Sequence, residues 1–258
     1  MRILFIGDIV GRPGRDIVFA SLDKLKKDYH IDFTIANGEN SAHGKGITSK
    51  IYHQFIDAGI DCITMGNHSF SKSEIIESLD SMDRLIVPHN HIKQVGVSAR
   101  VFDIDGFKLC VCNILGEVFM TEVTCSPYVA MNDILSKYPN ASFLVDLHAE
   151  ATSEKILFAH YYKDKVIATL GTHTHVQTAD ERLIGNEAYI SDVGMCGAYD
   201  SIIGRDIDEM INNRIKAANT RFTVASGAAQ LCACVVDIDT EEKKAVSITR
   251  IQIRPESS

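Results

Sequence analysis

Two histidines separated by a single threonine, His173 and His175, follow an apolar run that ends at Leu170 and Gly171. In an extended backbone, side chains at alternate positions point to the same side, with their Cα atoms roughly 6.5 to 7 Å apart. Imidazole is a common metal ligand, so this spacing suits two adjacent metal ions. A histidine-bearing loop in contact with water gives the same pattern, and only the rest of the chain separates the two interpretations.

Polar residues at other predicted strand ends favour the metal interpretation. Five short apolar runs each lead into side chains that can bind metal or transfer a proton, and in an open α/β sheet ligands bind beyond the carboxyl ends of the strands. Turn formation or helix capping explains Asp8 and Asn40 individually, but it explains three histidine-bearing strand ends poorly. The group comprises Asp8, Glu39, Asn40, Asn67, His68, His148, His173 and His175.

The ligand types narrow the choice of metal. Carboxylate, amide and imidazole ligands without thiolate favour iron, manganese or zinc over an all-oxygen calcium site. The seven cysteines are scattered, and the pairs Cys110/Cys112 and Cys232/Cys234 lie in alternating strand patterns. We therefore interpret them as reduced core thiols rather than as metal ligands.

Composition restricts the partners. The 258 residues are 45% hydrophobic and carry a formal charge of −8, which argues against a nucleic-acid groove or an anionic membrane as the main partner. A small anionic substrate held locally fits better. The apolar N-terminal run is too short for a signal peptide or a membrane span, so we expect a cytoplasmic protein. The apolar run from Leu231 to Val236 fits a core or an interface, and we expect a homo-oligomer.

The alternation of short β-rich runs with helical patterns predicts an α/β fold. Two stretches, 100–113 and 230–253, read instead as antiparallel hairpins, the first turning at Asp105-Gly106, so mixed sheets fit better than an all-parallel one. The predicted strands are 3–6, 33–36, 62–65, 143–147, 166–170 and 188–191, and the predicted helices are 15–28, 49–58, 72–79, 129–137 and 153–161.

Several motifs together carry a family resemblance. They are GDIVGRPG, NGEN, GNHSF, DLHAEATSEK, GTHTHVQTAD and SDVGMCGAYDSIIG, and the similarity extends from residue 1 to about residue 253. The chain resembles the calcineurin-like metallophosphoesterases, and specifically their YmdB-type branch of bacterial cyclic-nucleotide phosphodiesterases. The resemblance implies a four-layer α/β sandwich, with two mixed β-sheets flanked by helices, as a single domain over residues 1–254. Residues 255–258 are expected to form a frayed tail.

The resemblance also implies a ligand set for two metal ions, iron or manganese, with zinc as an alternative. The superfamily usually has D-x-H at its first strand, where this chain has Asp8-Ile-Val10. In the YmdB-type branch Asn40 supplies the missing ligand. The segment from Pro88 to Gly96 lacks the glycine-rich spacing of that branch. The implied set places Asp8, Asn40 and His175 on one ion and Asn67, His148 and His173 on the other, with Glu39 bridging both.

This ligand set leads to a mechanistic hypothesis. Two ions can hold a bridging water, lower its pKa and bind the phosphoryl oxygens of a small cyclic nucleotide, either 2′,3′-cyclic or 3′,5′-cyclic. His68 directly follows Asn67 and is the candidate proton donor to the leaving alkoxide. The resemblance gives this histidine the same role, although it could instead hydrogen-bond to a ligand. Asp146 and Asp192 are candidates to orient ligand histidines.

Other polar residues have weaker assignments. His43 could contact substrate or lie exposed on its loop, and His89 and His91 repeat the H-x-H spacing but read as loop residues. Arg12 and Arg15 fit phosphate binding and a simple helix entry equally well.

Three alternative functions remain open. Gly7 to Gly14 could form a phosphate loop, but the spacing matches no nucleotide-binding pattern and Pro13 removes an N–H. The chain could be a regulator that binds a cyclic nucleotide or a protein partner without catalysis. It could also be a phosphomonoesterase of the same fold.

Overall fold

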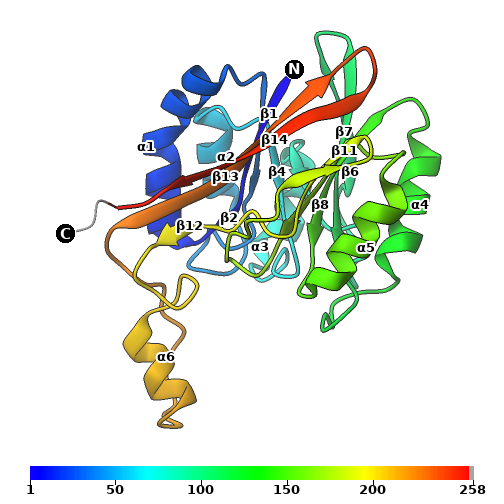
Figure 1. Cartoon of the computed structure of the whole chain (residues 1–258). Helices are drawn as coiled ribbons and strands as arrows, with labels where there is room; N and C mark the ends of the chain where they lie inside the picture. The colour runs from blue at the N-terminus through cyan, green and yellow to red at the C-terminus, as the bar shows by residue number, and fades with distance from the viewer. Residues whose placement is uncertain (256–258) are drawn as a thin grey trace.

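The computed structural model describes residues 1–255, in which two mixed β-sheets pack face to face between helices (Figure 1). The sequence predicts a frayed tail at Pro255 to Ser258. Residues 256–258 of this tail lie outside the described residues. No helix within residues 1–255 is long and apolar enough to cross a membrane.

The first sheet contains eight strands. Strands β1, β3, β4 and β5 are parallel, β2 runs parallel to β12, and β13 runs antiparallel to β1, β12 and β14. The order is β2 (Asp8–Ile9), β12 (Met195–Ala198), β13 (Ala229–Asp239), β1 (Arg2–Ile6), β3 (Phe33–Asn37), β4 (Cys62–Thr64) and β5 (Leu85–Ile86), with β14 (Lys244–Ile253) also paired to β13.

The second sheet contains six strands. Its four central strands are parallel, and each edge strand is antiparallel to its neighbour. The order is β10 (Arg182–Ile184), β11 (Glu187–Ile190), β9 (Ala168–Thr172), β8 (Ser142–His148), β7 (Phe107–Leu115) and β6 (Ala99–Ile104).

Helices cover the outer faces of both sheets, except for the last helix. In Figure 1, α6 projects away from the layered body. The helices are α1 (Gly11–Tyr29), α2 (Ser49–Asp57), α3 (Glu74–Ser78), the 3₁₀ turn η1 (Leu79–Ser81), α4 (Pro127–Lys137), α5 (Thr152–Tyr162) and α6 (Ile207–Arg214).

Three apolar layers hold the sandwich together. Val18 and Leu22 of α1 lie one helical turn apart and pack on the first sheet. Phe5 of the first sheet belongs to the cluster between the sheets. Met131 of α4 and Phe158 of α5 pack on the second sheet. Because the central strands are covered on both faces, they read as continuous apolar runs rather than as alternating patterns.

The fold prediction is confirmed: the protein is an α/β sandwich of two mixed sheets flanked by helices. All six predicted strands, all five predicted helices and both hairpins are present within a few residues. Helix α1 begins four residues earlier than predicted, at Gly11, so Pro13 lies in the first turn, where its missing N–H leaves no helical hydrogen bond unmade. The apolar run from Leu231 to Val236 is buried in β13 between β1 and β14, so it belongs to the core of the chain.

One of the buried carboxyl groups lies in β11 of the second sheet. Glu187 of β11 is fully buried, and burial raises its pKa to about 9. Above the ordinary glutamate value of 4.5, the unfolded chain ionises this group while the folded chain keeps it neutral. Stability is therefore lost as the pH rises from about 4.5 to about 9.

We expect Glu187→Gln to raise the free energy of unfolding by up to about 3 kcal/mol at pH 7, and by much less at pH 5, because the substitution removes the ionisation. Urea denaturation at the two pH values measures the gain. Glu241→Gln, at an exposed turn position, is the control. An equal gain at both pH values would show that ionisation of Glu187 is not the cause.

Candidate metal centre

The candidate residues come from the carboxyl ends of strands in both sheets. Glu39 and Asn40 follow β3, and Asn67 and His68 follow β4. The second sheet contributes three histidines, since β8 ends at His148 and β9 leads into His173 and His175, while Asp8 opens β2 directly after β1. The sandwich therefore brings together residues that are up to 167 positions apart in the sequence.

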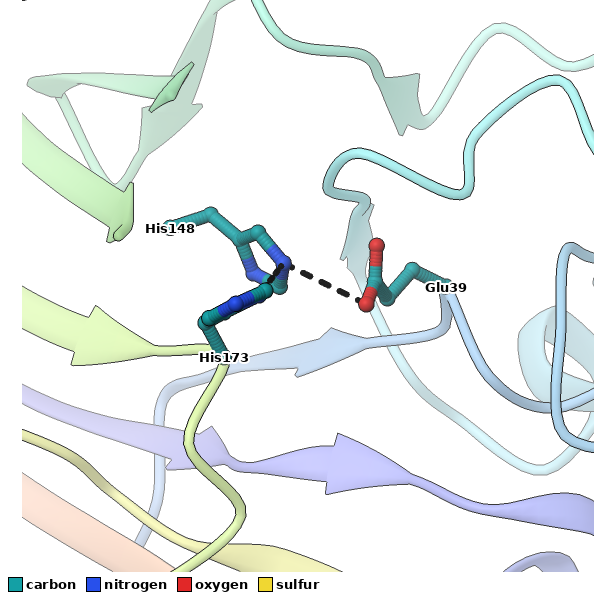
Figure 2. A group of neighbouring side chains, drawn as sticks. All are labelled: Glu39, His148 and His173. Carbon is teal, nitrogen blue, oxygen red and sulfur yellow. Dashed lines mark hydrogen bonds and ion pairs between the residues drawn. The ribbon is translucent and has the colours of Figure 1, made fainter. Parts of the chain in front are cut away.

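One group of side chains centres on His148. Its Nε2 atom lies 3.2 Å from Glu39 Oε1, 3.0 Å from His173 Nδ1 and 3.1 Å from Asn67 Oδ1. Figure 2 shows Glu39, His148 and His173 pointing toward one another. The possible ligand atoms of these three residues all lie within 4.8 Å of one another, which is a separation that a single cation can span.

A second group of side chains contacts the same Glu39 oxygen. The Asn40 amide Nδ2 lies 2.9 Å from Glu39 Oε1 and 3.1 Å from His175 Nε2, and His175 Nε2 lies 3.8 Å from Asp8 Oδ1. A half-turn of the Asn40 amide would place its oxygen at the same position. Asp8 Oδ1 is buried and has no hydrogen-bond partner among residues 1–255, so an acceptor atom is directed at this space.

The His148 nitrogen that does not face the cluster, Nδ1, takes part in a chain of hydrogen bonds. Its Nδ1 lies 2.8 Å from Thr172 Oγ1, and that hydroxyl donates to Asp146 Oδ1 over 2.6 Å. Thr172 must then accept from His148 Nδ1–H, so in the neutral form of the ring Nε2 carries the lone pair and directs it into the cluster. Asp146 therefore orients His148 through Thr172, and its other oxygen accepts from Asn37 Nδ2 of the opposite sheet over 2.9 Å.

The outer nitrogens of the other two histidines also face acceptors. His173 Nε2 lies 3.1 Å from Glu150 Oε2, and His175 Nδ1 lies 2.9 Å from the carbonyl oxygen of Ile203. These acceptors fix the protonated nitrogens on the outside and leave His173 Nδ1 and His175 Nε2 as the inner atoms. Partners of this kind orient histidine ligands at metal sites.

The electrostatics of the cluster favour a cation at its centre. Burial raises the pKa of Asp8 to about 7, against the attraction of His175 and His148. Burial opposes protonation of His148, but the Glu39 and Asp8 carboxylates still raise its pKa to about 9. Burial and the charge of His148 lower the pKa of His173 to about 3. The cluster thus retains one positive charge next to buried carboxylates, and a metal ion can take the place of that proton.

Close packing supports this arrangement. A Cβ atom at Gly66 would lie 2.3 Å from Glu39 Oε2 and 2.4 Å from His148 Nε2, so only glycine fits behind the cluster. His173 and His175 adopt positive φ angles of 105° and 67°, which cost energy for residues other than glycine. The loop from 172 to 175 is therefore held in place by its surroundings.

A buried ion pair holds that loop. Lys155 of α5 is fully buried and donates to the Thr172 carbonyl over 2.8 Å and to Asp192 Oδ2 over 3.1 Å. The same Asp192 oxygen accepts from the N–H of Thr174 over 2.9 Å. The pair therefore forms hydrogen bonds with the backbone on both sides of His173. Asp192 therefore orients His173 through the backbone rather than through its imidazole ring.

His68 borders the cluster without joining either group. Its N–H donates to Glu39 Oε2 over 3.0 Å, and its side chain lines a cavity of about 360 Å³ in front of the cluster. Burial lowers its pKa below the ordinary value of 6.5, although Glu39 counteracts this effect. The position puts an imidazole beside the space in which a substrate would lie.

The remaining histidines lie elsewhere or serve packing. His43 is exposed on its loop. His91 is buried against Phe70, with ring centroids 4.8 Å apart, and His89 Nε2 pairs with Asp133 Oδ2 over 2.8 Å. Asp133 is distant from His89 in the sequence, so this partner could not be read from local spacing.

The glycine-rich segment from Gly7 to Gly14 does not form a phosphate cradle. The N–H groups of Asp8, Val10 and Gly11 donate to the carbonyls of Gly194, Cys196 and Asn40. The Arg12 side chain is largely exposed and pairs with Asp16.

Arg15 donates to the Ser41 carbonyl, which favours the helix-entry interpretation over phosphate binding. All seven cysteines are free, and six of them are buried.

Comparison with known proteins supplies the family. The YmdB-like protein family matches residues 4–251. The chain belongs to this family. It is 45% identical over 257 residues to a Bacillus subtilis protein named 2′,3′-cyclic-nucleotide 2′-phosphodiesterase, covering 98% of this chain and 97% of the relative.

Two comparisons with Mycoplasma pneumoniae extend the YmdB-like assignment. A putative phosphatase/phosphodiesterase is 34% identical, covering 98% of this chain and 93% of the relative. A crystal structure described as a novel phosphatase superimposes with a TM-score of 0.92 at 32% identity, covering 98% of this chain and 93% of that one. The likeness thus extends over nearly the whole chain.

Some residues around this YmdB-like site were not singled out from the sequence. Lys155 lies within the DLHAEATSEK motif and reads as an ordinary helix lysine, and Glu150 lies in the same motif. Ile203 contributes through its backbone carbonyl, which leaves no signature in its side-chain type. Gly66, between Met65 and Asn67, was detectable as a glycine at a strand end.

Glu150, the partner of His173, is exposed, so it can be replaced without a change in the core. We expect Glu150→Ala to weaken metal binding by about tenfold or more, because the acceptor that fixes the His173 ring is lost. Competition with a metal chelator measures the affinity. Glu77→Ala, an exposed glutamate on α3, should leave it unchanged. Equal metal affinities for the two variants would show that Glu150 does not support metal binding through His173.

Proposed function

We propose that this protein is a metal-dependent phosphodiesterase with two metal ions, formed by one domain over residues 1–254. In this proposal Asp8, Asn40 and His175 bind one ion, Asn67, His148 and His173 bind the other, and Glu39 bridges them. The observation that carries it is the inward lone pairs of three histidines, whose outer nitrogens all face acceptors. The ions are iron or manganese, with zinc as an alternative, as the mixed oxygen and nitrogen ligands allow.

The ions and the side chains have separate tasks. Bound ions of this kind lower the pKa of water and bind phosphoryl oxygens. Among the residues of the chain, His68 donates a proton to the leaving alkoxide, because its imidazole lines the cavity next to Glu39. The Glu39 carboxylate accepts the His68 N–H and so fixes the distance between the donor and the ligand set. Thr172 and Asp146 keep His148 Nε2 directed inward.

The substrate class that fits is a small 2′,3′-cyclic nucleotide, with 3′,5′-cyclic nucleotides as a further substrate. The name of the B. subtilis relative supports this class, as does a cavity of about 360 Å³, within the range of small-ligand sites. The net charge of −8 argues against long nucleic acids. The names of the M. pneumoniae proteins keep phosphomonoesters as the second candidate class, and a regulator without catalysis is the remaining alternative.

Metal removal tests the proposal as a whole. We expect the purified protein to hydrolyse 2′,3′-cyclic AMP, to lose this activity after treatment with a chelator, and to regain it when manganese or iron is added. Product analysis by chromatography, with phosphomonoesters as parallel substrates, measures the reaction class. Full turnover by protein shown to be free of metal would contradict the mechanism, and metal binding without turnover of any ester would favour the regulator.

Replacement of His68 tests the proton donor. We expect His68→Ala to keep its metal content and to lose about 10²- to 10⁴-fold in kcat on the cyclic nucleotide, because the leaving alkoxide needs a proton. A diester that releases 4-nitrophenolate should lose much less, since that group leaves without protonation.

His53→Ala, an exposed histidine on α2, is the matched control. Unchanged turnover of both substrates by His68→Ala, with both metals retained, would assign the proton transfer to another group.

A further inference from the structure

The cavity in front of the metal centre has a second wall that no part of the mechanism uses. The segment 199–228, which includes the projecting helix α6, contributes Arg205 and Phe222 to its lining (Figure 1). The loop after Asn40 contributes Lys45. The same cavity is lined by Glu39 and the ligand histidines, so a substrate bound there by its phosphate would reach this wall.

Arg205 and Phe222 form a fixed stack. The guanidinium carbon of Arg205 lies 4.6 Å from the centroid of the Phe222 ring. Glu209 of α6 accepts two hydrogen bonds of 2.8 Å from Arg205 Nη2 and a third of 3.2 Å from Nε, and Thr220 donates to the same carboxylate over 2.7 Å. The Arg205 charge is already paired with Glu209. Arg205 therefore stiffens the wall and is a poor site for a second phosphate.

Phe222 is also fixed from its edge. A Cβ atom at Gly44 would lie 2.5 Å from the Cε1 atom of Phe222, so the ring packs directly on the backbone of the loop that follows Asn40. Gly44 has a φ of +83°, which favours glycine here for a second reason. The ring is half-buried, so part of it stays accessible from the cavity.

Lys45 provides the free charge of the wall. Its ammonium lies 5.7 Å from the Phe222 centroid, its side chain is exposed, and it forms no ion pair with any residue from 1 to 255. A flexible, unpaired ammonium can reach an anionic oxygen. The wall thus combines a neutralised planar stack with one mobile cation.

We propose that the Arg205–Phe222 stack is the platform for the nucleobase of the substrate, and that Lys45 binds a phosphate oxygen at the same time. This inference rests on the proposed phosphodiesterase function. A planar uncharged group fits the stack better than a second anion, because Glu209 already neutralises Arg205. Every base has a π-face, so a platform of this kind accepts all four bases with modest preference.

A pair of substrates that differ only in the base tests the platform. Adenosine 2′,3′-cyclic phosphate carries the base, whereas methyl riboside 2′,3′-cyclic phosphate lacks it. For the unaltered enzyme we expect the ratio of the two kcat/KM values to favour the nucleotide by about fivefold to 150-fold, the range for one stacked base. In Phe222→Ala this ratio should fall toward one, mainly through KM for the nucleotide, and Phe222→Tyr should restore it.

Two further variants separate the roles. Phe119→Ala removes an exposed phenylalanine that lies outside the cavity lining, and it should leave the ratio and both rates unchanged. Lys45→Met should lower kcat/KM for both substrates by a similar factor, because both carry the phosphate.

A failure of the proposed platform can be distinguished from a failure of the proposed phosphodiesterase function. If the unaltered enzyme hydrolyses both substrates with equal kcat/KM, or if Phe222→Ala leaves the ratio intact, the platform is wrong while the phosphodiesterase stands. If the metal-loaded enzyme hydrolyses neither substrate, the platform falls together with the proposed function. The ratio for the unaltered enzyme decides the question even if Phe222→Ala does not fold.

Discussion

The burial of Glu39 between two histidine-bearing groups is the constraint on which the rest of the site depends. Glu39 is 1% exposed, and one of its carboxylate oxygens lies 3.2 Å from His148 Nε2 and 2.9 Å from the Asn40 amide nitrogen. Asp8, fully buried nearby, adds a second carboxyl group. Uncompensated burial of such groups costs several kcal/mol each, so a cation bound among them would stabilise the cluster.

The cluster lies where the two sheets of the four-layer sandwich meet. The strands after which the candidate ligands lie belong to both sheets, so the site forms only where the two sheets meet. Asn37 of β3 donates to Asp146 of β8 across that junction, and Asp146 in turn orients His148 through Thr172. The Asp146 carboxylate therefore takes part both in the contact between the sheets and in the hydrogen bonds that set the tautomer of His148.

Much of this arrangement could be predicted from the sequence. The apolar runs predicted the buried strands, since a strand covered on both faces leaves few polar positions, and Asp105-Gly106 marked a hairpin. The polar residues at strand ends gave the candidate ligands because parallel strands end at a common edge. The strands β2, β5, β10 and β12 were missed because two to four residues show no clear period.

The features that could not be predicted from the sequence are contacts between distant residues and contacts made by backbone atoms. Lys155 looks like a solvated helix lysine, yet it is fully buried against Asp192. Ile203 acts through its carbonyl, and the pairing of Gly44 with Phe222 joins two irregular segments. Such contacts depend on the packing of the whole chain, and no local pattern encodes them.

Anomalous diffraction from a crystal of the manganese-loaded protein is the decisive test of a two-ion centre bridged by Glu39. We expect two peaks roughly 3.5 to 4 Å apart, one on each side of the Glu39 carboxylate. A single peak, or peaks that leave Glu39 without a metal contact, would contradict this two-ion centre.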